Sequence, residues 1–412
     1  MIQPLRPYQA RAVEAVRAEW SAGRLSVCLV APTGSGKTRL GEELLTCDEP
    51  CVWVAHRREL ITQTVARLRA RFGHSAVGAM MPGVYPTPGA RIQVGTVQTM
   101  LARGKRPPAR RAVFDECHHY AAEDWRCLVE AYGDTLRVGL TATPERGDGE
   151  PLGDVFGGLV VAANYSELTA DGFLVPVCVY RPAESLGNDL AQDPVDAWHA
   201  CSGGSSAFVF CARVAIAERV AQDFRNVGVR AACIHERTPR REREESLALF
   251  KRGIVRVLTN VNTLTEGVDV PEARTCILAR SFGHVGGYLQ AAGRVLRAAP
   301  GKESAIVVDL TGATIRHGLP TTDRAYSLSG RAISGGAAFG GGGQAPEFSQ
   351  SVRGVELVQV SGSPMPTAAI EREANKVDAR AERERLATIV ASMGLRPAVA
   401  DILFAQRFGG SR

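Results

Sequence analysis

Short runs of apolar residues alternate with helical patterns through most of this chain of 412 residues. A continuous apolar run is typical of a strand that is buried on both faces of a parallel sheet, and parallel strands need a crossover helix between them. We therefore predict an α/β domain with a parallel sheet over residues 1–180. Its strands are expected at residues 27–30, 51–55, 92–94, 112–114 and 138–140, with a helix at 59–72.

A second series of the same kind follows a stretch that contains Pro, Gly and Asp. We predict a linker at 181–206 and a second α/β domain at 207–330. Four consecutive glycines at 340–343 indicate a flexible linker, and the residues after it indicate a partly helical tail, within 331–412. The second domain should hold strands at 207–211, 230–235, 255–260, 275–279 and 305–309, with helices at 216–226, 240–251 and 288–297.

The composition limits the class of protein. With 45% hydrophobic and 22% charged residues the chain resembles a folded globular protein, and no apolar run is long enough to cross a membrane. We find no signal-peptide core and expect a protein that stays inside a cell. The net charge of +6 favours polyanionic partners. Ten cysteines include no CxxC pair, so we expect reduced thiols and no metal held by cysteine.

A glycine-rich loop at residues 31–38 (APTGSGKT) lies between a predicted strand and a helical segment, the context of a phosphate-binding loop. Backbone N–H groups around Gly34, Ser35 and Gly36 can curl around a phosphate at the start of a helix. Lys37 would neutralise the β- and γ-phosphates, and the Thr38 hydroxyl would hold Mg²⁺. The loop therefore predicts a site for a nucleoside triphosphate.

Two adjacent carboxylates follow the predicted strand 112–114. Because the carboxyl ends of parallel strands face the ligand in an open α/β sheet, Asp115 can reach the Mg²⁺ shell. Glu116 is then placed to orient and deprotonate an attacking water. The pair predicts hydrolysis of the bound nucleotide.

In the predicted helix 288–297, Gln290, Arg294 and Arg297 fall at i, i+4 and i+7, on one polar face. Gly293 weakens a helix and therefore suggests close approach of another surface.

Taken in order, these motifs resemble those of the superfamily 2 helicases and translocases of the DEAD/DEAH-like class. Within that class the chain is most similar to the Rad25-like and type III restriction helicase-subunit group of bacteria and phages. The resemblance covers residues 2 to about 330 and implies two tandem RecA-like domains that use ATP and Mg²⁺. It implies a cytoplasmic protein, nucleoid-associated or phage-encoded in the bacterial cytoplasm. It also implies that Arg294 and Arg297, with Gln290, complete the ATP site from the second domain as arginine fingers.

The resemblance implies further roles for single residues. One departure from the family pattern is His235-Glu236 where relatives often show His-Gly, which leaves a strand contact there open. The implied roles are adenine recognition by Arg6 and Gln9; ATP contacts by Gly267 and Asp269; nucleic-acid contacts by Arg57, Thr96, Thr263 and Thr265; and coupling of ATP state to movement by His118, Thr141 and Thr143.

The leading hypothesis is an ATP-dependent DNA helicase or translocase that acts on duplex, forked or single-stranded DNA as a monomer. An RNA helicase would use the same motor, and an ATP-gated clamp that remodels a nucleoprotein would unwind little. For the tail at 331–412 three alternatives stay open: it binds a protein partner, it binds DNA, or it does neither.

Overall fold

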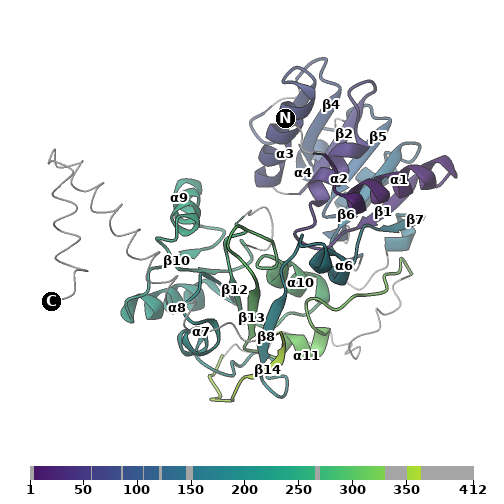
Figure 1. Cartoon of the computed structure of the whole chain (residues 1–412). Helices are drawn as coiled ribbons and strands as arrows, with labels where there is room; N and C mark the ends of the chain where they lie inside the picture. The colour runs from purple at the N-terminus through teal and green to yellow at the C-terminus, as the bar shows by residue number, and fades with distance from the viewer. Residues whose placement is uncertain are drawn as a thin grey trace, which may run out of the picture. The chain divides into compact units, whose positions relative to one another are not determined.

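The computed structural model describes residues 4–56, 58–84, 87–104, 106–119, 123–144, 152–264, 270–329 and 350–362. The chain divides into two compact units, each built on a seven-stranded sheet (Figure 1). The first unit contains the chain up to Leu174, the segment Gly283–Gly293 and the segment that starts at Pro320. The second contains Val175–Phe282, Arg294–Leu319 and the segment 350–362.

The sheet of the first unit is parallel throughout, in the order β3-β4-β2-β5-β6-β1-β7. Every residue of β2 is buried, as expected for a strand covered on both faces. The predicted strands are all present. The strands are β1 (Ser26–Val30), β2 (Cys51–Ala55), β3 (Val77–Met80), β4 (Ile92–Thr96), β5 (Arg111–Asp115), β6 (Leu136–Thr141) and β7 (Gly158–Val161).

Helices cover both faces of this sheet. On one face α1 packs on β1 and β7, α2 on β5 and β6, and α3 on β3 and β4. On the other face, α4 and α5 enclose a core with Phe114, Trp125 and Phe156. The helices are α1 (Pro7–Ser21), α2 (Lys37–Leu44), α3 (Arg58–Phe72), α4 (Val97–Ala102), α5 (Glu123–Glu130), α6 (Tyr165–Ala170) and α10 (Val285–Gly293), with short 3-10 turns η1 (Cys117–His119) and η2 (Leu152–Asp154).

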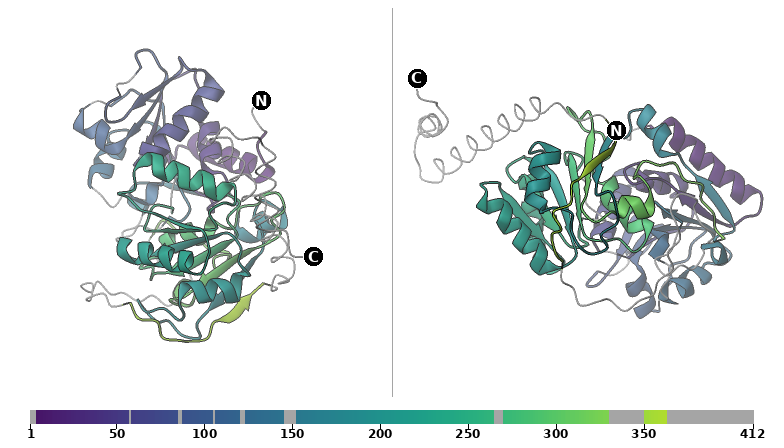
Figure 2. Two further views of the ribbon diagram at one scale, coloured as in Figure 1. Left: turned by 90° about the vertical axis from the view of Figure 1, so that its left-hand side faces the viewer. Right: turned by 90° about the horizontal axis from the view of Figure 1, so that it is seen from below.

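The sheet of the second unit has the order β10-β11-β9-β12-β13-β8-β14, and only β14 runs antiparallel to its neighbour. Helices α7 and α8 lie side by side on one face (Figures 1 and 2), over a core with Trp198, Phe224 and Ile277. On the other face Phe250 of α9 stacks on Phe208 of β9. The elements are β8 (Val177–Arg181), β9 (Ala207–Cys211), β10 (Ala231–Ile234), β11 (Val257–Asn260), β12 (Thr275–Ala279), β13 (Ala305–Asp309), β14 (Val358–Ser361), α7 (Pro194–Ser202), α8 (Val214–Asn226), α9 (Arg240–Lys251) and α11 (Ala313–His317).

The observed boundaries differ from the predicted ones. Strand β8 ends the predicted first domain but pairs with β13 of the second sheet, and the predicted linker at 181–206 contains helix α7. Strand β14 lies within the predicted tail and pairs with β8. These assignments depend on pairing between distant segments, which no local pattern reveals. The rest of the predicted tail, residues 331–349 and 363–412, lies outside the described residues.

Two further properties bear on the chemistry of the chain. All ten cysteines are free thiols, and burial raises the pKa of Cys117 well above its ordinary value. Among the described helices, none combines the length and apolar character required to cross a bilayer.

A buried lysine ties two loops of the second unit together. Lys302 is 7% exposed, and its Nζ donates hydrogen bonds to the carbonyl oxygens of Pro271 at 2.9 Å and Ala273 at 2.6 Å. Burial, together with the guanidinium groups of Arg274 and Arg297, lowers the pKa of Lys302 to about 7.

This lowered pKa predicts a pH-dependent stability. Between pH 7 and the ordinary lysine pKa the folded state binds fewer protons than the unfolded state, so the free energy of unfolding rises with pH. Relative to Lys302→Met, the wild type should gain about 1 kcal/mol per pH unit between pH 7.5 and 9.5. Urea unfolding of both proteins across this range measures the difference. A constant difference would show that the ammonium group stays protonated in the fold.

Candidate nucleotide site

Three neighbouring strands of the first sheet bring the predicted nucleotide-site residues together. In the order β5-β6-β1, Asp115 ends β5, Thr141 ends β6, and the glycine-rich loop follows β1. The strands are parallel, so their carboxyl ends lie at one edge. The Ala31 N–H donates to the Thr141 carbonyl oxygen at 2.9 Å, which fixes the start of the loop beside the end of β6.

The glycine-rich loop has the backbone that a phosphate cradle needs. Gly34 and Gly36 have φ angles of +94° and +84°, in the left-handed region that favours glycine. The backbone N–H and Oγ of Ser35 both donate to the Pro32 carbonyl oxygen, at 3.1 and 2.7 Å. Helix α2 begins at Lys37 directly after Gly36. Its first N–H groups have no partner inside the helix and can donate to an anion.

The first turn of α1 supports this loop. Tyr8 and Gln9 are buried, and both side chains donate hydrogen bonds to the Ser35 carbonyl oxygen, Gln9 Nε2 at 3.1 Å. Gln9 Oε1 accepts a hydrogen bond from the Arg6 N–H at 3.1 Å. The structure therefore brings the predicted adenine-binding segment against the phosphate loop, while base recognition itself stays a prediction.

An aromatic residue that the sequence analysis missed lies beside this segment. The Arg6 guanidinium lies 4.3 Å from the ring centre of Phe173, and the Tyr8 and Phe173 ring centres are 5.4 Å apart. Phe173 follows α6, far along the chain from Arg6, and nothing in its local sequence marks it. It widens the candidate adenine surface to Arg6, Gln9 and Phe173.

The two carboxylates lie opposite the lysine of the loop. Glu116 Oε1 is 3.8 Å from Lys37 Nζ, and both side chains are 12% exposed. Asp115 is buried, and its Oδ1 accepts a hydrogen bond from the Glu116 N–H at 3.1 Å. Glu116 has a φ of +51°, an unfavourable conformation for a residue with a side chain, and such strain often marks functional sites.

The donor set fits a magnesium–nucleotide complex. Glu116 Oε2 is buried and accepts no hydrogen bond from the described residues, which leaves it available to a water. No three His, Cys, Asp or Glu side chains of the described chain group as metal ligands. Mg²⁺ usually binds through one or two protein oxygens together with phosphates and waters. The Thr38 hydroxyl and the Asp115 carboxylate are the groups that would hold it here.

A buried hydrogen-bond network centred on His118 lies beside Glu116. His118 Nδ1 lies 3.1 Å from Thr141 Oγ1 and 3.5 Å from Glu116 Oε2, and His118 Nε2 lies 3.1 Å from Gln290 Nε2. Because the Gln290 amide nitrogen can only donate, His118 Nε2 accepts and the ring proton is assigned to Nδ1. Thr141 Oγ1 in turn donates to the Thr143 carbonyl oxygen at 2.5 Å. The three predicted coupling residues therefore form one connected network.

Helix α10 ends earlier than predicted. It ends at Gly293, so Arg294 and Arg297 follow the helix, and the predicted common helical face with Gln290 is wrong. The backbone leaves the helix because Val295 and Leu296 are buried and the Leu296 carbonyl oxygen accepts a hydrogen bond from the Val175 N–H at 2.9 Å. The expected close approach at Gly293 is confirmed, since a Cβ there would lie 2.5 Å from Thr33 Cβ.

The remaining predicted residues have varied surroundings. Thr96 is buried and caps α4, accepting a hydrogen bond from the Thr99 N–H at 3.2 Å. Thr263 Oγ1 donates to the Val261 carbonyl oxygen at 3.0 Å. Both hydroxyls thus have local partners. Four predicted residues lie outside the described residues: Arg57, Thr265, Gly267 and Asp269.

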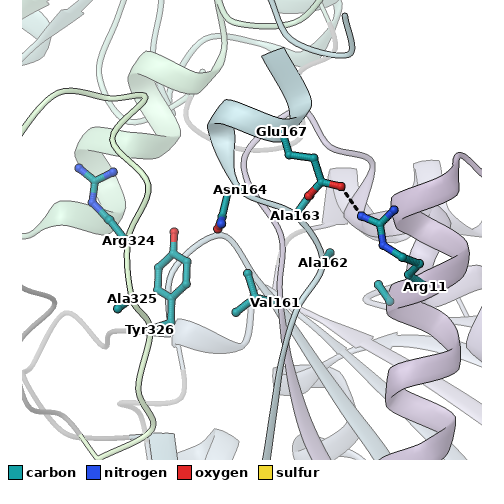
Figure 3. A pocket seen from close by; sticks show the side chains of 10 residues that line it. Arg11, Val161, Ala162, Ala163, Asn164, Glu167, Arg324, Ala325 and Tyr326 are labelled. Atoms are coloured by element: carbon teal, nitrogen blue, oxygen red, sulfur yellow. Dashed lines mark hydrogen bonds and ion pairs between the residues drawn. The ribbon is translucent and has the colours of Figure 1, made fainter. Parts of the chain in front are cut away.

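A cavity of about 390 Å³ in the first unit is separate from the phosphate loop (Figure 3). It is lined by α1, the end of β7, α6 and residues 324–326, and Arg11 forms an ion pair with Glu167 at its rim. Neither the glycine-rich loop nor Asp115 and Glu116 contribute to its lining. The cavity is therefore not the nucleotide site.

Comparison with known proteins agrees with this geometry. The family model described as "Type III restriction enzyme, res subunit" matches residues 2–146, and "Helicase conserved C-terminal domain" matches residues 195–299. The chain belongs to the superfamily 2 helicases. The helicase domains imply an enzyme that hydrolyses ATP, generally with Mg²⁺.

Relatives of this helicase include a protein whose name specifies DNA. It is 25% identical to the "DNA 3'-5' translocase XPB2" of Sulfurisphaera tokodaii, over 75% of this chain and 82% of that protein. It is 26% identical to the "Putative mitochondrial ATP-dependent helicase irc3" of Schizosaccharomyces pombe, over 79% of this chain and 60% of that protein. A putative HsdR subunit of a type I restriction enzyme from Vibrio vulnificus has the same fold, with a TM-score of 0.60, 22% identity and coverage of 75% of this chain and 64% of that one.

The support of the phosphate loop by Gln9 predicts a change in nucleotide affinity. In Gln9→Glu a carboxylate replaces the donor that faces the Ser35 carbonyl oxygen, so the loop should lose its support. We expect the affinity for an ATP analogue to fall about tenfold, equivalent to about 1.4 kcal/mol, in a fluorescence titration. Gln222→Glu, at an exposed position on α8, is the matched control. Equal affinities for both variants would contradict the role of this contact.

Proposed function

We propose that this helicase couples ATP hydrolysis to movement along DNA. The observation that carries the proposal is the convergence of Lys37, Glu116 and His118 at one edge of the first sheet, with His118 hydrogen-bonded to Gln290. At one end of this network, Lys37 and Glu116 are placed to contact a nucleotide. At the other end, Gln290 belongs to helix α10, which precedes Arg294. The relative named as a DNA translocase supports DNA as the polymer.

In the proposed reaction, the backbone of the glycine-rich loop and Lys37 bind the β- and γ-phosphates. Bound Mg²⁺ would neutralise phosphate charge, held by Thr38 and Asp115. Glu116 orients the attacking water through its available Oε2 and accepts a proton from it. Lys37 Nζ lies 3.8 Å from Glu116 Oε1, so the cation of the loop and the carboxylate face the same phosphates.

Arg294 and Arg297 act on the γ-phosphate in the transition state, because guanidinium groups stabilise the charge that develops there. Arg6 and Gln9 bind the adenine, and Gly267 and Asp269 contact ATP. His118, Thr141 and Thr143 relay the nucleotide state to helix α10 through Gln290.

Movement follows from alternation between an ATP-bound and a hydrolysed state of the two units. Arg57, Thr96, Thr263 and Thr265 hold the nucleic-acid backbone in the proposed mechanism. Backbone contacts carry little sequence information, and their strength depends strongly on salt. We therefore propose a motor that moves along DNA of any sequence.

The first test is ATP turnover with no polymer, single-stranded DNA, duplex DNA, forked DNA and RNA. We expect DNA to stimulate turnover. Lys37→Ala should abolish turnover, because Lys37 is the one charged residue of the loop 31–38 that can neutralise the phosphates. Stimulation by RNA alone would refute DNA as the polymer while retaining the motor. Stimulation by DNA without strand displacement on a fork would indicate a translocase or a nucleoprotein clamp that unwinds little.

Two variants test the assigned roles. Glu116→Gln should bind ATP normally and lower kcat by about 10²–10⁴-fold, because it can position water but not accept its proton. Arg294→Ala should lower kcat at least about 100-fold with little change in ATP affinity. Arg241→Ala, at an exposed position on α9, is the control for a lost arginine. If Arg294→Ala alters DNA affinity alone, its role as an arginine finger is wrong.

A further inference from the structure

Three histidines of the first unit form a continuous chain of imidazole rings in tilted contact. The ring centres of His56 and His119 are 4.3 Å apart, and those of His119 and His118 are also 4.3 Å apart. The planes of the two pairs are inclined by 51° and 39°. The proposed function uses His118 only, so His56 and His119 require an explanation of their own.

The three rings connect two segments that have different proposed functions. His56 directly follows β2 and precedes residue 57 and helix α3, the segment proposed to hold the nucleic-acid backbone. His118 contacts Glu116, Thr141 and Gln290 at the nucleotide site. His119 lies between them. Strands β2 and β5 are hydrogen-bonded neighbours, so their carboxyl ends bring His56 beside the turn that holds the other two rings.

The main chain that carries the middle ring is held in place. The His119 N–H donates to the Glu116 carbonyl oxygen at 3.1 Å, and η1 holds His118 and His119 in one short turn. His118 is 8% exposed and hydrogen-bonded through both ring nitrogens. Adjacent rings are in contact, so a shift of one ring displaces its neighbour. A displacement of His56 would therefore reach His118 and Glu116 through His119.

We propose that His119 is a positioning residue that transmits nucleic-acid binding at the segment after β2 to the hydrolytic groups. This inference rests on the proposed function and names the path by which polymer stimulates turnover. His119 acts through its ring contacts with His56 and His118. Its neighbour His118 holds Glu116 and Gln290 in place.

The first experiment measures kcat and KM for ATP with and without DNA in His119→Ala and His119→Phe. The ratio of DNA-stimulated to unstimulated kcat should fall about tenfold in His119→Ala and recover within about threefold of wild type in His119→Phe, since phenylalanine keeps a stacking ring. His74→Ala, at an exposed position, should keep the wild-type ratio. A proportional loss of both kcat values, or no recovery in His119→Phe, would overturn the proposal.

A double-mutant cycle with His56→Ala tests whether the rings act in series. If they do, the double variant should show the same stimulation ratio as either single variant, whereas independent roles would give the product of the two losses. Additive losses would overturn the proposal.

A second measurement does not depend on DNA. Coupling between two sites is reciprocal, so an ATP analogue should shift the ring resonances of His56 in ¹⁵N-histidine-labelled protein. The shift should be present in the wild type, absent in His119→Ala and restored in His119→Phe. If no polymer stimulates the wild type but this pattern appears, the proposed function fails and the relay stands. If His56 does not respond to nucleotide in the wild type, the relay fails.

Discussion

Parallel pairing of β5, β6 and β1 is the constraint on which the rest of the site depends. The glycine-rich loop, the two carboxylates and Thr141 come from distant parts of the sequence, and only this strand order places them at one edge. Core side chains pack closely against Gly139 on β6, because a Cβ there would lie 2.3 Å from the Phe156 ring and 2.8 Å from Cys117 Sγ. The core beside β6 therefore has no room for a larger side chain at this position.

The polar groups at this edge are held for a ligand. A pairing distance of 3.8 Å between Lys37 and Glu116 is too long for a good hydrogen bond, yet both groups are largely buried. Buried charges need compensation, and a triphosphate with a water would complete the partners of both side chains. The left-handed backbone at Glu116 also indicates a ligand site. The surrounding contacts maintain a conformation that is locally unfavourable, as is common at functional sites.

His118 connects the nucleotide site to Gln290 of α10 and to the ring of His119. The two nitrogens of His118 contact Thr141 and Gln290, and its ring face contacts His119, so hydrogen bonds and packing meet in one side chain. In the proposed mechanism this junction transmits a change at the nucleotide both to α10 and to the segment after β2. A bistable motor needs contacts of this kind, because a displacement must be passed on without being absorbed.

The sequence by itself determined the α/β class, most of the strands, and the motifs of the nucleotide site. Buried parallel strands and glycine-rich turns have strong local signatures, and β2, β9, β12 and β13 were placed correctly to the residue. Only the tertiary structure decided that α10 stops at Gly293, that Phe173 joins Arg6, and that His56, His119 and His118 stack. It also assigned β8 and β14 to the second sheet. Each of these depends on contacts between segments far apart in the chain, and such contacts override local propensity.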